Sequence, residues 1–405
     1  MSKNCFKPAD ILLPKDVSYE KFAVVACDQY TSELEYWKRV EKFVGDDMSS
    51  LHMIYPEIYL DKKPKNKIKN IHDTMNKYLK DDMFKSFVQK YIYLERKMTD
   101  GKIRKGIVGA VDLEEYDYNK GSQTAIRATE ETVLERIPPR VKIRNNAALE
   151  LPHVMLLFDD PKKTVIEKID VTNCEKAYDF GLMENGGHIT GYFLDDKNSE
   201  HIEKSLSKLA AKTEMLFAVG DGNHSLAAAK SCYEQLKKKQ GEKAKTSPAR
   251  YALCEIVNLH DDSLVFEPIH RVLTEVDPQN VITELRNFYR LTKKEQEHPI
   301  HYITKDDEQT LHLKNPKASL PVGTIQDFIG HYIENHGGKV DYIHGDDVVI
   351  SLSKAKNTIG FFVPTIHKSQ LFDSVIKDGA LVRKTFSMGH ANEKRFYLEA
   401  RIILQ

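Results

Sequence analysis

Apolar and polar residues alternate along this chain with two different periods, which predict a mixture of helices and strands. Five segments have apolar residues at the spacing of an α-helix: 32–43, 68–90, 202–212, 225–239 and 279–289. Short apolar runs at 22–27 and 215–219 predict strands. No repeat of fixed period is visible. We therefore expect an α+β protein with mixed, largely antiparallel sheets and helices.

Four pairs of strand-like runs are each joined by a short polar turn, which is typical of antiparallel hairpins. The predicted pairs are 91–98 with 103–113, 154–158 with 165–169, 251–258 with 264–269, and 301–304 with 310–313. In the first pair the turn contains Asp100-Gly101, which can supply the positive φ angles of a tight hairpin.

The length of 405 residues predicts two or three domains. The best candidate boundaries lie near 145–151 and 291–299. They divide the chain into an N-terminal α+β domain at 1–147, a central domain at 148–295 and a C-terminal α+β segment at 296–405. The central domain contains the turn at 220–225.

Charge and cysteine content narrow the function classes. Sixty Lys and Arg residues balance 60 Asp and Glu residues, so a broad positive field for nucleic-acid binding is absent. The five cysteines are scattered with no C-x-x-C pair, and no apolar run is long enough to span a bilayer. These features predict a cytoplasmic protein with reduced, mostly buried thiols and neither a membrane nor a nucleic acid as partner.

The sharpest local feature is a polar turn between an apolar strand and an alanine-rich helix. It reads Gly220-Asp221-Gly222-Asn223-His224-Ser225. The glycines would let backbone N–H groups approach a ligand, Ser225 could cap the helix, and the helix N-terminus favours an anion. Asp221 could hold Mg²⁺ or accept a hydroxyl proton, and His224 could bind or protonate a phosphate oxygen.

The same turn has a purely structural interpretation as a tight turn with a capped helix. Its spacing nearly copies a dinucleotide-binding fingerprint, but Asp221 would face the pyrophosphate unless a cation intervened. The P-loop pattern is absent from this region.

A second cluster, at 126–144, contains four arginines whose planar guanidinium groups suit a polyphosphate. The nucleotide-binding candidates in this segment are Arg127, Thr129, Glu130, Arg136 and Arg140. Pro138-Pro139 should end any helix and could direct Arg140 toward a site. A charged surface helix with Glu and Arg pairs explains the same residues equally well.

Two shorter pieces offer further phosphate donors. They are His270-Arg271, at the end of a predicted strand, and Lys384 within Lys384-Thr385-Phe386-Ser387. Each is also common at ordinary strand ends, so their weight depends on convergence with the other motifs.

Read together, these motifs resemble a widespread prokaryotic family of unassigned function that carries an Asp-Gly-x-His signature turn. The resemblance spans nearly the whole chain. It rests on residues 108–113, 126–130, 151–153, 221–224, 268–271 and 384–389. The turn is similar to that of the ParB/sulfiredoxin-like superfamily, which includes free-serine kinases. This chain has Asn223 and Ser225 where a second His and an Arg are usual.

The resemblance implies a ParB/sulfiredoxin-like core with additional domains and a nucleotide site at the turn and the arginine-rich segment. It implies phosphoryl transfer from ATP or ADP, with Mg²⁺, to a hydroxyl acceptor such as free L-serine. The protein would then be a phosphotransferase with an alcohol group as acceptor, with a nucleotide and a small hydroxyl-bearing metabolite as ligands. A homodimer is an open alternative for its assembly.

Two other functions stay open at this point. One is a non-enzymatic nucleotide-binding switch of the ParB-like type, and the other is a hydrolase that uses Asp221 and His224 on water. For the kinase and the hydrolase, the catalytic candidates are Asp221 and His224, and Asp221 is the metal candidate. The nucleotide-binding candidates outside the arginine-rich segment are Gly220, Gly222, Asn223, Ser225, His270, Arg271 and Lys384.

Overall fold

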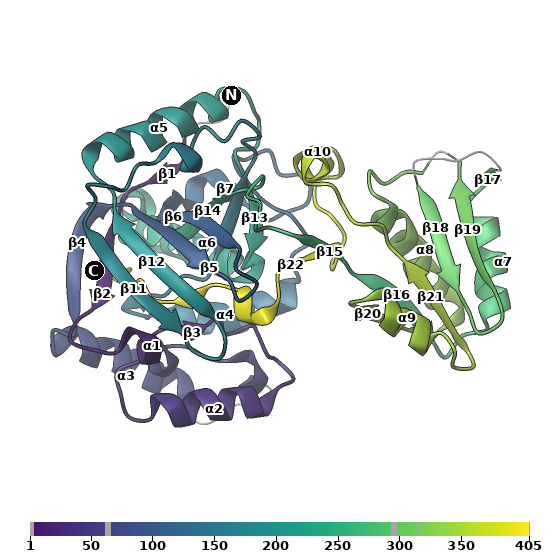
Figure 1. The fold of residues 1–405 in the computed structure, drawn as a ribbon, viewed down its shortest axis with the longest axis horizontal. Helices are drawn as coiled ribbons and strands as arrows, with labels where there is room; N and C mark the ends of the chain where they lie inside the picture. Colours follow the sequence, from purple (N-terminus) through teal and green to yellow (C-terminus); the bar gives the residue numbers. More distant parts are fainter. Residues whose placement is uncertain (1–3, 61–65, 293–297, 315, 405) are drawn as a thin grey trace. The chain divides into compact units, whose positions relative to one another are not determined.

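The computed structural model describes residues 4–60, 66–292, 298–314 and 316–404, shown in Figure 1. The chain forms two compact units, Met1–Leu264 with His390–Gln405, and Val265–Gly389. The first unit is therefore built from both ends of the chain. The boundary expected at 147/148 lies inside this unit, where Ala147 and Ala148 belong to the same hydrophobic core. The boundary expected at 295/296 lies outside the described residues.

A ten-stranded sheet forms the centre of the first unit. Its strands run in the order β11 (Lys176–Leu182), β12 (Gly187–Phe193), β5 (Ile92–Lys97), β6 (Ile103–Asp112), β14 (Tyr251–Asn258), β10 (Met155–Phe158), β13 (Phe217–Asp221), β8 (Ile126–Ala128) and β7 (Tyr116–Asp117), with β1 (Phe6–Lys7) beside β6. The pairs of β10 with β14, β13 with β8, and β7 with β8 are parallel, and the other pairs in this sheet are antiparallel.

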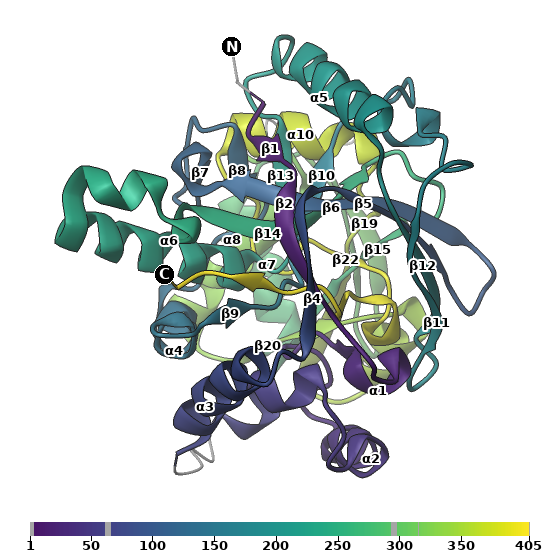
Figure 2. The same cartoon turned by 90° about the vertical axis from the view of Figure 1, so that its left-hand side faces the viewer.

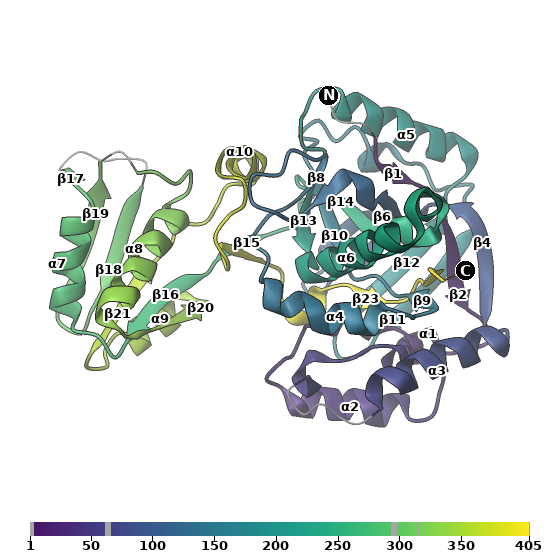
Figure 3. The same cartoon turned by 180° about the vertical axis from the view of Figure 1, so that it is seen from behind.

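Helices bury their apolar faces against this sheet. In Figure 3, α4 (Ile137–Arg144) lies alongside α6 (Asn223–Gln240), where Ile137 and Val141 pack against Ala227 and Ala228. Helix α5 (Asp196–Ala210) contributes Ile202, Leu206 and Ala210 to the sheet's core. At the end of the unit opposite α5 (Figure 2), a second core contains residues of α1 (Tyr19–Phe22), α2 (Leu34–Val44) and α3 (Lys67–Lys80).

Three short ladders connect distant parts of the first unit. They pair β2 (Ala9–Pro14) with β4 (Phe84–Lys90), β3 (Val24–Val25) with β23 (Phe396–Tyr397), and β9 (Leu149–Glu150) with β24 (Arg401–Ile402). Beside them, the buried guanidinium group of Arg395 donates to the carboxylates of Glu255 and Glu399. The C-terminal segment is thus held by both backbone pairing and buried charge.

The second unit is a six-stranded antiparallel sheet with helices. Its strands are β17 (Leu291–Thr292), β19 (Glu308–Leu313), β18 (Pro299–Ile303), β21 (Thr358–Phe362), β16 (His270–Thr274) and β20 (Lys339–Ile343), in that order. Its helices are α7 (Pro278–Phe288), α8 (Pro321–His336), α9 (Asp346–Leu352) and α10 (Lys368–Asp378). A separate ladder pairs β15 (Phe266–Pro268) with β22 (Phe386–Met388).

The predicted α+β class with largely antiparallel sheets is confirmed. The helices expected at 32–43, 202–212, 225–239 and 279–289 correspond to α2, α5, α6 and α7. Two hairpins are also confirmed, β5 with β6 and β18 with β19. Gly101, in the first of these turns, has a φ of 86°.

Four local predictions are wrong. The helix expected at 68–90 ends at Lys80, and residues 84–90 form β4 because they pair with β2. The strand expected at 22–27 is only β3, preceded by α1. The runs at 154–158 and 251–258 are strands, but they pair with each other and not with 165–169 or 264–269. Residues 166–168 form a 3₁₀ turn, and β15 pairs with β22.

All five cysteines are free thiols, of which Cys5 and Cys254 are buried and the other three are half-buried. In the described parts of the chain, every helix is too short or too polar to cross a membrane.

Candidate functional site

The turn at 220–225 joins strand β13 to helix α6. Gly222 precedes the helix with a φ of 81°, which glycine adopts without strain. A Cβ at this position would lie 3.0 Å from the Cα of Val154, so both conformation and space require glycine. Gly220, in contrast, lies within β13. Only one of the two predicted glycines therefore shapes the turn.

The eighteen-residue helix α6 begins without a side-chain cap. The expected cap by Ser225 is wrong, because Ser225 lies inside the first turn and its hydroxyl meets His153 instead. The first-turn amide groups carry the positive end of the helix dipole. The carboxamide oxygen of Asn223 is buried and accepts no hydrogen bond from the described residues. This end of α6 is therefore suited to an anionic ligand that also carries a hydrogen-bond donor.

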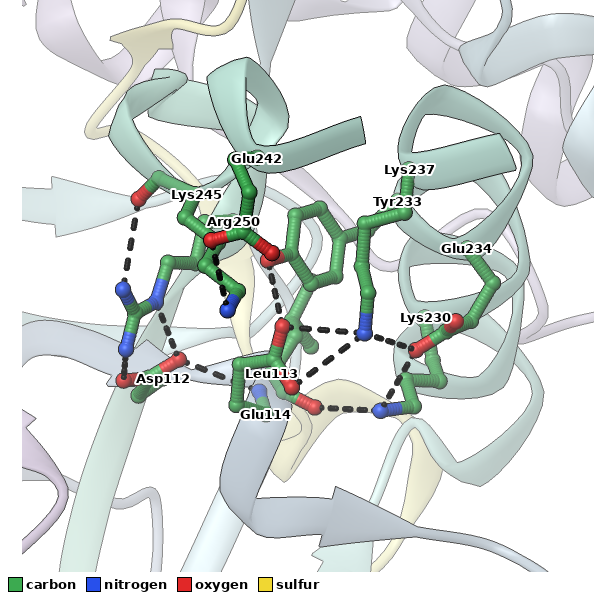
Figure 4. Close-up of polar contacts among 10 residues, drawn as sticks. All are labelled: Asp112, Leu113, Glu114, Lys230, Tyr233, Glu234, Lys237, Glu242, Lys245 and Arg250. Atoms are coloured by element: carbon green, nitrogen blue, oxygen red, sulfur yellow. Dashed lines mark hydrogen bonds and ion pairs between the residues drawn. The ribbon is translucent and has the colours of Figure 1, made fainter. Parts of the chain in front are cut away.

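A charged cluster fixes α6 further along its length (Figure 4). The Tyr233 hydroxyl donates to Glu114 Oε1 at 2.6 Å, and Lys237 Nζ lies 3.0 Å from the same oxygen. Lys230 Nζ donates to the carbonyl oxygen of Leu113 at 2.8 Å. Because these partners belong to the end of β6 and the following turn, they hold the helix in register with the sheet.

His153 connects the turn to the C-terminal segment. Its Nε2 lies 3.1 Å from Ser225 Oγ, and its Nδ1 lies 2.6 Å from the Tyr397 hydroxyl. The Asp28 carboxylate is 3.6 Å from the same Nε2. The ring itself is buried, with 4% of its surface exposed. Ser225, His153 and Tyr397 thus form a continuous chain of groups that can each donate or accept a proton.

The acid and the thiol beside this histidine have shifted pKa values. Burial opposes ionisation of Asp28, but the charge of His153 and its hydrogen bond outweigh burial, so the pKa of Asp28 lies below its usual range. Burial, reinforced by Asp28, raises the pKa of the Cys27 thiol to about 11. Near neutral pH, Asp28 is therefore a carboxylate, and Cys27 is a protonated thiol.

Lys394 provides a positive charge at the turn. Its Nζ lies 3.5 Å from Asp221 Oδ2, and both side chains are largely buried. Asp221 Oδ1 also accepts the backbone N–H of Gly222 at 3.0 Å. The pairing of β23 with β3 fixes the backbone that follows Lys394. A cation and an anion therefore lie together at the mouth of the turn.

A pocket of about 140 Å³ opens beside Ser225. Ser225, His153, Cys27 and Tyr397 line one part of it. Two charged pairs line another part: Arg140 with Glu57, and Arg144 with Glu150 at 2.5 Å. The remaining wall is mostly apolar.

Several of the predicted site residues lie close together here. Ser225 and Arg140 line the same pocket. The hydroxyl of Thr129 donates to the carbonyl oxygen of Val219 at 2.7 Å, next to the turn. The backbone N–H of Val133 donates to His224 Nε2 at 3.3 Å. Glu130 is half-buried directly after Thr129. The turn and the segment at 126–144 are thus neighbours, and their roles toward a nucleotide stay predictions.

The guanidinium groups of two arginines in this segment, Arg127 and Arg140, donate to backbone carbonyl oxygens. The buried guanidinium of Arg127 donates to the carbonyl oxygens of Thr124 and Glu214, and burial lowers its pKa. Arg136 is exposed, and its carbonyl oxygen accepts from Arg140 Nη1 at 2.8 Å. The prediction that Pro138-Pro139 ends a helix is wrong, because these prolines occupy the first turn of α4, where a missing N–H costs nothing.

The candidates His270, Arg271 and Lys384 belong to the second unit. Arg271 is fully buried and donates to the carbonyl oxygens of Ile269, Arg383 and Lys384. His270 Nδ1 accepts the backbone N–H of Val363 at 3.0 Å, and its Nε2 lies 2.8 Å from Asp346 Oδ1. These contacts hold the second unit together, and a role in nucleotide binding stays a prediction.

Reasoning from residue patterns missed four side chains of this site: Asp28, Glu57, Lys394 and Tyr397. Asp28 follows a strand-like run, but a single acid after a strand is too common a signal. Lys394 and Tyr397 reach the turn only through the pairing of β23 with β3, some 370 residues apart in sequence. His153 was part of the motif at 151–153, without a role assigned to it.

A resident metal site is absent from the described residues, which hold no group of three or more His, Cys, Asp or Glu side chains arranged for a cation. Asp221 offers a single carboxylate, with Lys394 beside it. Mg²⁺ is commonly held by one or two carboxylates together with substrate phosphates. Asp221 is one such carboxylate, but Lys394 already lies beside it, so a Mg²⁺ ion at Asp221 stays a prediction.

Comparison with known proteins gives one family. The family described as "Protein of unknown function (DUF1015)" matches residues 9–331. Among curated proteins, none matches this chain.

Similar solved structures share little sequence with this chain. A mutant of a free serine kinase in complex with ADP has 9% identity and a TM-score of 0.41, covering 75% of this chain and 94% of the other. A conserved hypothetical protein from Pyrococcus furiosus has 9% identity and a TM-score of 0.38, covering 71% and 92%. SbnI from Staphylococcus aureus, with a C-terminal truncation, has 10% identity and a TM-score of 0.37, covering 70% and 82%.

Proposed function

The chain belongs to the DUF1015 family of proteins of unknown function, and we propose from its own site that it transfers a phosphoryl group from a nucleotide to a small hydroxyl compound. One observation carries the proposal. The uncapped N-terminus of α6, the Asp221 and Lys394 pair, and the Ser225 and His153 pair all meet at the turn that follows β13. Phosphoryl transfer requires an anion site and a proton acceptor side by side, and this turn offers both.

The phosphate groups bind at the N-terminus of α6. Backbone N–H groups and the helix dipole favour the anion, and Lys394 adds a full positive charge. Asp221 would repel a bare phosphate, but it accepts a cation that accompanies the nucleotide. Arg140 lines the adjoining pocket and is paired with Glu57, so this step does not use its predicted role as a phosphate ligand.

The hydroxyl acceptor binds on the Ser225 side of the turn. His153 Nε2 accepts the proton of the acceptor hydroxyl, while the Asp28 carboxylate stabilises the resulting imidazolium. The acceptor oxygen forms a bond to the terminal phosphorus, and the bond from that phosphorus to the bridging oxygen of ATP or ADP breaks. The products are a phosphate monoester and a nucleotide shorter by one phosphate.

In this proposal, His153 takes the role of the proton acceptor, while Asp221 and His224 act on the phosphate side. A ParB/sulfiredoxin-like core belongs to the proposal as well. Free L-serine is the acceptor that the motifs alone suggest, whereas the proposal itself requires only a small hydroxyl compound. His270, Arg271 and Lys384 have no assigned step in it.

The substitution Asp221→Asn tests the proposal, because it keeps the shape of the side chain and removes the charge. We expect an unchanged melting temperature without ligand and phosphoryl transfer lowered by about 10²–10⁴-fold, measured by ³¹P NMR with ATP or ADP and Mg²⁺. The matched control is Asp117→Asn, another acid at the end of a strand of the same sheet, which should keep full transfer.

Binding of nucleotide is measured separately by thermal shift. If the wild-type protein binds ATP or ADP but transfers no phosphate to any hydroxyl compound, the non-enzymatic switch replaces the kinase. If neither nucleotide raises the melting temperature at millimolar concentration, the proposed function is wrong.

A further inference from the structure

The pocket beside Ser225 is apolar in a way that phosphoryl transfer alone does not explain. Its wall includes apolar side chains from five separate elements, namely Met53, Met75, Ile143, Leu226 and Leu253. Met53, Leu226 and Leu253 are buried, and Ile143 is half-buried at the edge of α4. A wall of this composition favours an apolar occupant because its burial releases water from both surfaces.

The charged groups on the wall are paired with one another. Arg140 pairs with Glu57, and Arg144 pairs with Glu150, whose other oxygen accepts from Arg401 at 2.7 Å. A zwitterion such as a free amino acid would therefore have to give up its hydration without gaining an uncommitted partner charge there.

The pocket also has one polar side. Ser225 Oγ, His153 Nε2 and the Tyr397 hydroxyl lie on it. Asp221, which belongs to the proposed phosphate site, stands at the end of β13 where the same turn begins. A ligand with an apolar body and a single hydroxyl would therefore place its hydroxyl at His153 and its body against Ile143 and Met75.

We infer that the acceptor is an alcohol with an apolar body the size of one aromatic ring or a short branched alkyl chain, and not free serine. This inference rests on the proposed function for the identity of the reaction. The volume of about 140 Å³ is close to the roughly 150 Å³ of an engineered apolar cavity that binds benzene. A purine base is larger, and its ring nitrogens would meet hydrocarbon on most of this wall.

The test measures binding of benzyl alcohol and of L-serine to the full chain by isothermal titration calorimetry, with and without ATP and Mg²⁺. We expect benzyl alcohol to bind and L-serine not to bind. Along the series ethanol, propanol, butanol, affinity should rise by about fourfold for each added methylene group until the pocket is full. Binding of L-serine in place of benzyl alcohol would overturn the inference and leave the proposed transfer intact.

Two substitutions at one half-buried position locate the binding site. Ile143→Trp fills the pocket and Ile143→Ser removes apolar surface without crowding, so each should weaken benzyl alcohol binding at least tenfold. Both should keep ATP affinity within twofold of wild type. The matched control is Leu209→Ser on α5, a half-buried apolar residue of the same unit outside the pocket, which should change neither affinity.

The variants separate the two proposals. If the Ile143 variants weaken ATP and not benzyl alcohol, the pocket holds the nucleotide base and the inference is wrong. If benzyl alcohol binds at this position while no nucleotide binds, the inference on the ligand stands and the proposed function fails.

Discussion

Two buried histidines, His153 in the first unit and His270 in the second, show how similar surroundings produce different chemistry. Each has a carboxylate near Nε2, Asp28 for His153 and Asp346 for His270. They differ at Nδ1. A backbone N–H, that of Val363, donates to Nδ1 of His270, whereas a hydroxyl, that of Tyr397, faces Nδ1 of His153.

A backbone N–H can only donate, so Nδ1 of neutral His270 must be the acceptor and its proton must reside on Nε2. A hydroxyl can donate or accept a hydrogen bond, so the hydroxyls of Tyr397 and Ser225 are compatible with either tautomer of His153. The backbone therefore fixes which ring nitrogen of His270 carries the proton, as suits a structural role. Neither ring nitrogen of His153 is fixed in this way, as suits proton transfer.

The largest expected effect follows from removing the exchangeable histidine. His153→Gln should lower phosphoryl transfer by about 10²–10⁴-fold, because a side-chain amide is too weak a base to take the proton from the hydroxyl group of the substrate. Steady-state kinetics with ATP, Mg²⁺ and the best alcohol acceptor measure it. The matched control is His260→Gln, which removes another histidine from beside an aspartate, 2.6 Å from Asp159, in the same unit. Equal losses in both variants would contradict the comparison.

A loss of stability, without a loss of chemistry, is expected in the second unit. His270→Leu leaves the buried N–H of Val363 without its acceptor, which should cost about 1–3 kcal/mol of unfolding free energy. Urea denaturation followed by circular dichroism measures this cost. Asp346→Asn is the control, and it should change stability little because Asp346 is 73% exposed. A lower phosphoryl-transfer rate in folded His270→Leu would show that His270 acts in the reaction.

A smaller effect is expected from Tyr397→Phe, which removes the hydroxyl from Nδ1 of His153 and keeps the ring. We expect a decrease in kcat of about two- to tenfold, the equivalent of one hydrogen bond. Tyr178→Phe is the control, because its buried hydroxyl donates to Glu399 at 2.6 Å outside the pocket. An unchanged pH profile of kcat in Tyr397→Phe would show that Tyr397 does not influence the proton of His153.

The smallest expected effect is a pH dependence of stability in the second unit. Burial, opposed in part by Asp346, lowers the pKa of His270 below its ordinary value of 6.5. The unfolded state therefore binds more protons, so the contribution of His270 is present above pH 6.5 and is lost as pH falls through the lower, folded-state pKa. Calorimetry should show a lower melting temperature of this unit at pH 5.5 than at pH 7.5. The difference should shrink in His270→Leu, and an equal difference in that variant would assign it to other groups.

Local patterns predicted elements whose partners are close in sequence. The hairpin of β5 and β6 and the helices α5, α6 and α7 need no distant contact to be recognised. The helix expected at 68–90 included residues 84–90, whose Phe84, Phe87 and Val88 have helical spacing, and only pairing with β2, far upstream, makes them a strand. The run at 154–158 likewise pairs in parallel with β14, a choice that depends on the whole sheet.

The candidate site divides in the same way. Gly222 and Ser225 could be singled out because they follow a strand and begin a helix within a few residues. Asp28, Lys394 and Tyr397 could not, because each is an ordinary residue in its own segment and gains a role only where the pairing of β3 with β23 brings the segments together. Within the arginine-rich segment, the guanidinium of Arg127 satisfies backbone carbonyls in the interior, and the role of the segment toward a nucleotide stays a prediction.

The pairing of β3 with β23 also determines when the candidate site can form during synthesis of the chain. Residues 24–25 leave the ribosome early, and their partners at 396–397 are made only after the whole second unit. During synthesis, the strand β3 therefore waits with an unpaired edge while more than 360 residues are added. Closing so long a loop is slow compared with local folding. The pocket, the Tyr397 hydroxyl and the charge of Lys394 then arrive together in a single late step, and ribosome-stalled chains that end before residue 394 should be folded over much of their length and inert.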